Sequence, residues 1–155
     1  MRHLPLVALA AVFLPTVVHA QIQAAGERQE QARLPQGKSP IWATLRTTKI
    51  IEDDARGIFE ARHPPQVKAL NGKVITLQGF LMPLDEQTTG THFLLSKYTP
   101  VCAFCPPGEP NEVVEIHTAR PITYTQRMVT VSGRFGLEDN GEKGLFFQMA
   151  SADVR

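Results

Sequence analysis

The chain has little cysteine and no excess of charge of either sign. Two cysteines in 155 residues are too few for a disulfide-framework fold, so the fold must depend on a hydrophobic core. Sixteen basic side chains are matched by 15 acidic ones, which leaves a net charge of +1 at pH 7. Nucleic acids and anionic membranes attract proteins through clustered Lys and Arg, so this balance argues against both as partners.

Motifs of the common catalytic machineries are lacking as well. The chain has no nucleophile–base motif, no glycine-rich phosphate loop and no paired carboxylates in a recognisable context. We therefore expect a binding protein with no catalytic residues, and not an enzyme. The sequence does contain an apolar start, a series of alternating segments and one loop that carries both cysteines.

The first 20 residues have the form of a secretory signal peptide. Residues 1–3 are basic, residues 4–18 are almost wholly apolar, and residues 18–20 have the small-x-small form that a signal peptidase cleaves. The apolar run is too short for a membrane span, and no cysteine at the cleavage site offers a lipid anchor. We expect cleavage after Ala20 and a soluble periplasmic protein with no membrane insertion. Cleavage leaves 135 residues with 15 basic and 15 acidic side chains, the size of a single domain.

The mature chain divides into a leader and one domain. Residues 21–40 contain hardly any large apolar side chains, which predicts a flexible leader; a short amphipathic helix over 22–33 is the alternative. Residues 41–155 are expected to form the domain. It should begin with a short helix over about 40–46, because Ser39 is a good N-cap and the proline after it suits the first helical position.

Most of the domain alternates between apolar and polar residues, which is the period of half-buried strands. Two of these strands contain a glycine, Gly79 and Gly133, of the kind that marks a bend or a bulge. The pattern favours an all-β fold, namely a small, OB-like, partly open barrel of about five to seven strands with a short N-terminal helix. Residues 53–66 are expected to be irregular. The strands are expected over residues 46–53, 73–85, 92–98, 112–119, 127–137 and 145–154.

Both cysteines, Cys102 and Cys105, lie as a Cys-x-x-Cys motif in the proline-rich loop 99–111. A thioredoxin-type site places such a motif at a helix N-terminus, and Pro106 and Pro107 exclude a helix directly after Cys105. In an oxidising compartment a disulfide between the two cysteines is one interpretation. Metal binding is another, and it needs further ligands, because a structural zinc site has four.

Two histidines on the flanking strands are the candidates for those ligands. His117 is expected on the outward face of the strand after the loop, and His92 opens the strand before it. A zinc site would then consist of Cys102, Cys105, His92 and His117. Copper(I) needs only two thiolates with an assisting thioether or imidazole, and Met82 is the candidate thioether.

Other polar residues near the loop have two interpretations. Glu109, Glu112 and Glu115 flank the cysteines, where they would either tune a bound metal or solvate the loop. His63 stands before two prolines and is expected to be a loop residue and not a ligand.

The chain resembles a family of small exported bacterial proteins of unknown function. The resemblance covers about residues 42–150 and is carried by Trp42, by "VKALNGKVITLQGFLMPLD" and by "FLLSKYTPVCAFCPPGEPNEVVEI". Some relatives lie beside transporter components in zinc-responsive gene clusters, which implies a role in metal handling. Some carry histidine where this chain has Cys105, and this exchange implies a metal ligand, because histidine binds metal but forms no disulfide.

Three functions remain open at this point. The first is a periplasmic accessory or carrier that binds zinc or copper and serves a transport system or another periplasmic protein. The second is an OB-like adaptor that binds a protein or peptide and whose cysteines form a structural disulfide. The third is a thiol–disulfide redox partner.

Overall fold

A computed structural model of the protein describes residues 25–84, 87–101 and 108–155. Within these residues, no helix is long and apolar enough to cross a membrane.

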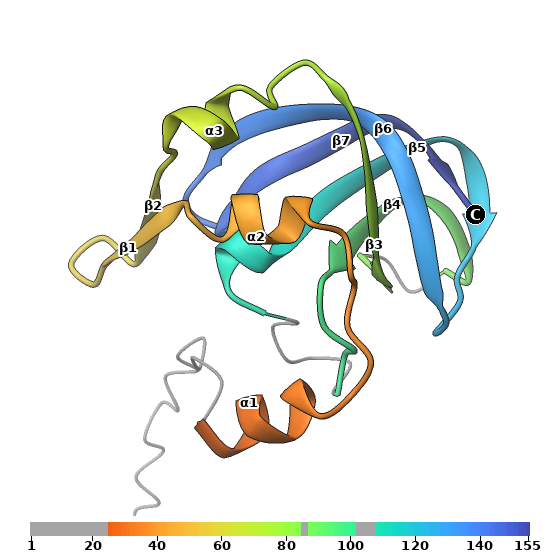
Figure 1. Ribbon diagram of the computed structural model, residues 1–155, viewed down its shortest axis with the longest axis horizontal. Coiled ribbons are helices and arrows are strands. Elements are labelled where there is room, and N and C mark those ends of the chain that lie inside the picture. Colours follow the sequence, from red (N-terminus) through yellow and green to blue (C-terminus); the bar gives the residue numbers. More distant parts are fainter. Residues whose placement is uncertain (1–24, 85–86, 102–107) are drawn as a thin grey trace, which may run out of the picture.

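Five strands form a closed barrel in the order β3-β4-β5-β7-β6, and β6 pairs with β3 to complete the ring (Figure 1). All neighbours are antiparallel except β5 and β7, which run parallel. The all-β, OB-like prediction is confirmed, but the barrel is closed and not partly open. It closes because the 13-residue β6 is long enough to pair with β3 at one end and with β7 at the other. The strands are β3 (Val74–Pro83), β4 (Thr89–Ser96), β5 (Val113–Thr123), β6 (Met128–Asn140) and β7 (Leu145–Val154).

A separate hairpin extends from the barrel. It consists of β1 (Lys49–Asp53) and β2 (Ile58–Arg62), which pair in an antiparallel two-stranded sheet (Figure 1). The prediction that residues 53–66 are irregular is therefore wrong. Gly57 adopts φ +65°, a conformation that glycine adopts readily, and this turn returns the chain along β1. The Phe59 amide donates to the Gly141 carbonyl, which joins the hairpin to the β6–β7 turn.

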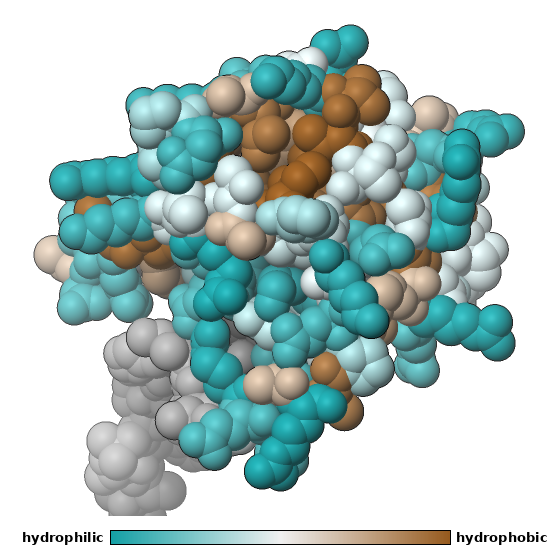
Figure 2. Space-filling model, viewed as in Figure 1, coloured by the Kyte–Doolittle hydropathy of each residue, from teal (hydrophilic) through white to brown (hydrophobic). Residues whose placement is uncertain are grey.

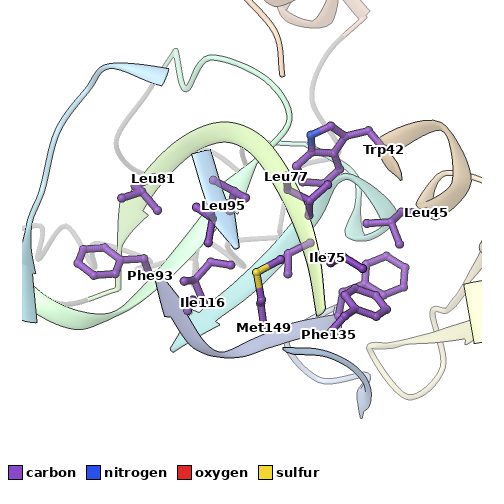
Figure 3. Close-up of a cluster of buried hydrophobic side chains, with 14 of the residues drawn as sticks. Trp42, Leu45, Ile75, Leu77, Leu81, Phe93, Leu95, Ile116, Phe135 and Met149 are labelled. Atoms are coloured by element: carbon purple, nitrogen blue, oxygen red, sulfur yellow. The ribbon is translucent and has the colours of Figure 1, made fainter. Parts of the chain in front are cut away.

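The alternating pattern places Ile75, Leu77, Val131 and Met149 on the inner faces of their strands, and these residues lie in the core of the barrel. Helix α2 (Ile41–Leu45) lies against the barrel, and Trp42 and Leu45 pack into its core (Figure 3). Helix α3 (Pro65–Lys68) adds the buried Val67. In Figure 3 the α2 residues lie on one side of the cluster, while Leu81 and Phe93 lie on the other. Further core residues are Leu95, Ile116, Phe135 and Phe147.

Helix α1 (Ala25–Ala32) lies in the segment for which the composition predicts a leader. The structure therefore agrees with the alternative prediction of a short helix within residues 22–33. Gln31 is buried and donates its Nε2 to the Thr99 carbonyl, and Gln36 forms a β-bridge with Tyr98. The surface over α1 is mainly hydrophilic (Figure 2). Polar contacts, from Arg28 to Glu109 and from Gln31 to Thr99, join this helix to residues that flank the cysteine loop.

Candidate metal centre

His92 and His117 stand directly opposite each other on β4 and β5. Their neighbours Phe93 and Ile116 point into the core, so the two histidines point outward, as the alternating pattern predicted for His117. The imidazole rings are stacked, with centroids 4.5 Å apart and planes 14° from parallel. The side chains are 41% and 45% exposed, which leaves both rings accessible from solvent.

Glu115 joins the two histidines from the same face of β5. Its Oε1 lies 2.6 Å from His92 Nε2 and 3.9 Å from His117 Nε2. The carboxylate is only 18% exposed, so it lies beneath the more exposed rings. One ligand atom from each of the three residues lies within 4.8 Å of the other two. We call this group the His–Glu–His cluster.

Two irregularities in the sheet adjoin the cluster. The β4–β5 register shifts between Gly90 and His92, and the β5–β7 register shifts between Ile116 and Thr118, on either side of His117. Bulges change the direction of nearby side chains and are frequent beside functional sites. Both histidines therefore lie beside a local departure from the regular ladder.

The ligand types and spacing of the His–Glu–His cluster suit zinc. Zinc binds imidazole nitrogen and carboxylate oxygen at about 2.0–2.2 Å, so tetrahedral ligand atoms stand about 3.3 Å apart. The two separations from Glu115 Oε1, 2.6 and 3.9 Å, lie on either side of that value. Binding one ion would require rotation of these partly exposed side chains, including a turn of the stacked rings that brings the ion into both ring planes. Two imidazoles and one carboxylate also match a ligand set known for catalytic zinc.

The structure brings together only part of the site predicted from the sequence. Cys102 and Cys105 lie outside the described residues. The last β4–β5 pair before the loop is Ser96 with Val113, and it lies four residues along each strand from the pair of His92 and His117. At about 3.3 Å per residue the two pairs are about 13 Å apart. The histidines thus form a cluster with Glu115 at a distance from the base of the loop.

The predicted copper ligand Met82 does not reach the cluster. It pairs with Leu94 on β4, and Leu94 pairs in turn with Glu115 on β5. Two inter-strand spacings, about 10 Å in all, separate the backbone of Met82 from that of Glu115.

The other two glutamates beside the loop have structural roles. Glu112 ends the 3-10 helix η1 (Pro110–Glu112), and its side chain is only 2% exposed. It accepts hydrogen bonds from Tyr98 Oη at 3.1 Å and from the Glu109 amide at 3.0 Å, and it pairs with Arg46 Nε at 3.0 Å. The Glu109 carboxylate pairs with Arg28 of α1. Of the three glutamates, therefore, only Glu115 faces the histidines. Glu115 and His117 are two residues apart on one strand, so their side chains lie on the same face. This spacing is the sequence signal that predicts their proximity.

His63 lies elsewhere, between β2 and α3, in accordance with its interpretation as a loop residue. Its Nδ1 is 3.2 Å from Thr48 Oγ1, and its ring lies 5.5 Å from that of Phe147. Burial, and next the positive charge of Lys68, lower the pKa of His63 below its usual value. The residue lines a surface pocket of about 310 Å³ together with Ala61, Leu137, Glu138, Asp139 and Phe146.

Comparison with known proteins shows the family and the fold. No curated protein matches the chain. It is similar to the crystal structure of a DUF3299 family protein (PA4066) from Pseudomonas aeruginosa PAO1, with 24% identity and a TM-score of 0.51. The similarity covers 79% of this chain and 87% of that one, and it supports the fold described above. The sequence profile of the family described as "Protein of unknown function (DUF3299)" matches residues 16–150. The chain therefore belongs to the DUF3299 family.

Proposed function

We propose that this protein binds a transition metal, with zinc as the first candidate, through His92, Glu115 and His117. It would act as an accessory or carrier in the periplasm, serving a transport system or another periplasmic protein, and not as an enzyme. The observation that carries the proposal is the convergence of two opposed imidazoles and one carboxylate on the outer face of β4 and β5.

The cluster has little value for folding, which supports a functional reason for it. Both histidines are more than 40% exposed, and exposed ion pairs contribute only about 0–1 kcal/mol to stability. Two stacked imidazoles also repel each other when both are protonated, so a stable surface does not require this pairing. A metal ion would hold both rings and the carboxylate through one centre.

The ligand types favour zinc over copper(I). Copper(I) prefers soft thiolate and thioether ligands, whereas imidazole and carboxylate suit zinc. Within the described residues the cluster contains no sulfur ligand. Copper(II) binds nitrogen and oxygen sites more tightly than zinc does, so a test needs both metals.

Isothermal titration of the metal-free protein with zinc, and separately with copper(II), tests the proposal. We expect one zinc per chain, and each of the substitutions His92→Ala, Glu115→Gln and His117→Ala should weaken binding by more than about 10–100-fold, the usual loss for an outer-shell partner of a metal site. His63→Gln is the matched control, since His63 lies outside the cluster, and it should bind zinc as the wild type does.

A double substitution, Cys102→Ser with Cys105→Ser, separates this site from the one suggested by the sequence. If zinc binding survives in this variant and is lost in the cluster variants, the cluster is the site. Loss only in the cysteine variant would place the metal on the cysteines and refute the proposal. If the wild type binds neither zinc nor copper and native mass spectrometry finds a stable Cys102–Cys105 disulfide, the metal function fails altogether.

A further inference from the structure

We infer that the metal bound by the His–Glu–His cluster keeps one coordination position open, and that a partner protein fills it with a thiolate or imidazole of its own. The metal would then move between the two proteins by ligand exchange. This inference rests on the proposed metal function and specifies how the site would be used.

The first argument is the number of ligands. Three residues converge, and in the part of the chain that the structure describes no fourth His, Cys, Asp or Glu joins them. A tetrahedral ion held by three protein ligands has its fourth position occupied by water or by an incoming ligand. Structural zinc sites, by contrast, have four protein ligands and are closed. The cluster is therefore of the open type.

The second argument is the direction in which the open position faces. Glu115 is 18% exposed and lies deepest, whereas the rings of His92 and His117 are 41% and 45% exposed. A metal bound by these three groups would present its remaining position to solvent, on the outside of the barrel. A donor on another protein can approach such a position without entering a cavity.

The third argument is the surface around the cluster. β4 and β5 are the second and third strands of the barrel, and in OB-like barrels the face of these strands is a usual binding surface. Apolar side chains adjoin the histidines there. Leu84 is 44% exposed and follows Pro83, whose cross-strand partner Phe93 is the neighbour of His92. The partly exposed Leu94 and Met82 lie in the next row. We call these three residues the apolar rim; it would contact the residues that flank the incoming ligand.

The exchange needs no oxidant or reductant. A lone pair of the partner's sulfur or nitrogen forms a bond to the metal, and the water in the open position leaves. The bond from Glu115 or from one imidazole then breaks and water hydrates the released group, while a partner thiol loses its proton to solvent as its sulfur binds. Each further bond made by the partner allows one bond of the cluster to break until the ion has moved.

Cobalt(II) substitution tests the open position, because its visible absorption reports the coordination of the ion. The cobalt-loaded wild-type protein is titrated with imidazole and with N-acetylcysteinamide. We expect saturable changes in the absorption with both compounds, and a new thiolate-to-cobalt band with the second. In parallel, the rate of zinc release should rise in proportion to the concentration of an added chelator, since exchange begins with attack at the open position.

A thiol-containing peptide with leucine on both sides of its cysteine tests the rim. It should bind the cobalt protein several-fold more tightly than N-acetylcysteinamide, and Leu84→Ser should remove most of that difference without altering binding of the smaller thiol. Equal binding of the two thiols by the wild type would show that the rim has no part in recognition.

Three other outcomes decide the main inference. The site is closed, and the inference is wrong, if cobalt binds but neither imidazole nor N-acetylcysteinamide changes its absorption, and if the rate of zinc release does not depend on chelator concentration. If the Cys102→Ser, Cys105→Ser variant responds where the wild type does not, a cysteine of the chain itself fills the position, which also overturns the inference. If the cluster binds neither cobalt nor zinc, the proposed function itself has failed, a result distinct from both.

Discussion

Gly79 of β3 and Ser96 of β4 approach so closely that a Cβ atom at position 79 would stand only 2.4 Å from the Ser96 carbonyl oxygen. The contact lies where β3 changes partner, from β6 along residues 74–80 to β4 along residues 80–83. Only glycine, which has no side chain, allows the backbones of β3 and β4 to approach each other so closely here. The tight corner of the barrel therefore depends on glycine at this position.

Replacing Gly79 by alanine should destabilise the protein strongly. The new methyl group meets backbone, which cannot move without disturbing the sheet, so we expect a loss of about 1–3 kcal/mol or more in the free energy of unfolding. Urea unfolding followed by circular dichroism measures it. Gly26→Ala is the matched control, because nothing lies within 4 Å of that position in α1 and alanine favours helix. Similar stabilities of the two variants would refute the argument.

Glu112 should be important for stability although it has no expected part in the metal site. Glu112→Gln keeps the size of the side chain but leaves Arg46 and Arg28 without the buried carboxylate that they share. We expect a loss of about 2 kcal/mol or more, since removing one partner of a buried ion pair is costly. Thermal or urea unfolding tests this value. Glu30→Gln removes the exposed pair with Arg33 and should change stability by less than about 1 kcal/mol; a comparable loss there would contradict the special role of Glu112.

Trp42 is the only tryptophan of the chain and reports on the contact between α2 and the barrel. It is 1% exposed, and its Nε1 donates to the Gln78 carbonyl at 2.7 Å. The fluorescence emission of the native protein should therefore be blue-shifted, and it should move to longer wavelength on unfolding. Trp42→Phe should cost about 2 kcal/mol, because the hydrogen bond is lost and a cavity remains. Native emission at the wavelength of free tryptophan would show that α2 does not cover the core.

His63 should make the stability of the metal-free protein depend on pH. Burial, followed by the charge of Lys68, lowers its pKa in the folded state, so the fold favours the neutral imidazole. The contribution is complete above about pH 6.5, the pKa of histidine in an unfolded chain, and it is lost as the pH falls towards the lower folded-state pKa. In that window the unfolded chain binds more protons. The loss of stability between pH 7 and pH 5 should be smaller in His63→Gln than in the wild type, measured by urea unfolding at each pH. Equal losses in the two proteins would contradict this role of His63.

The fold could largely be predicted because alternation determines which residues face the core. Leu77, Val131 and Met149 are buried as the pattern required, and the bends at Gly79 and Gly133 occur where other strands come close. β1 lies within the strand predicted over residues 46–53, but its partner β2 could not be predicted, because the hairpin is joined to the distant β6–β7 turn. The parallel pairing of β5 and β7 could not be predicted from the sequence either, because it follows from the closure of the barrel.

The candidate site was predicted only in part, for a reason of register. The outward directions of His117 and Glu115 follow from alternation, but the residue that faces them depends on how β4 and β5 align. A long loop does not determine that alignment, and the bulge at Gly90 shifts it further. The sequence therefore suggested His92 and His117 as ligands without indicating that they oppose each other.

The position of β7 in the barrel has a consequence for folding during synthesis. β7 lies between β5 and β6, so the ring cannot close until β7 has followed the four other strands out of the ribosome. It also carries buried residues of the core, Phe147 and Met149 among them. An emerging chain that ends before Leu145 thus has an open sheet and an unfilled interior. Such a chain cannot complete the barrel, which takes its final form only once β7 has been made and joins β5 and β6.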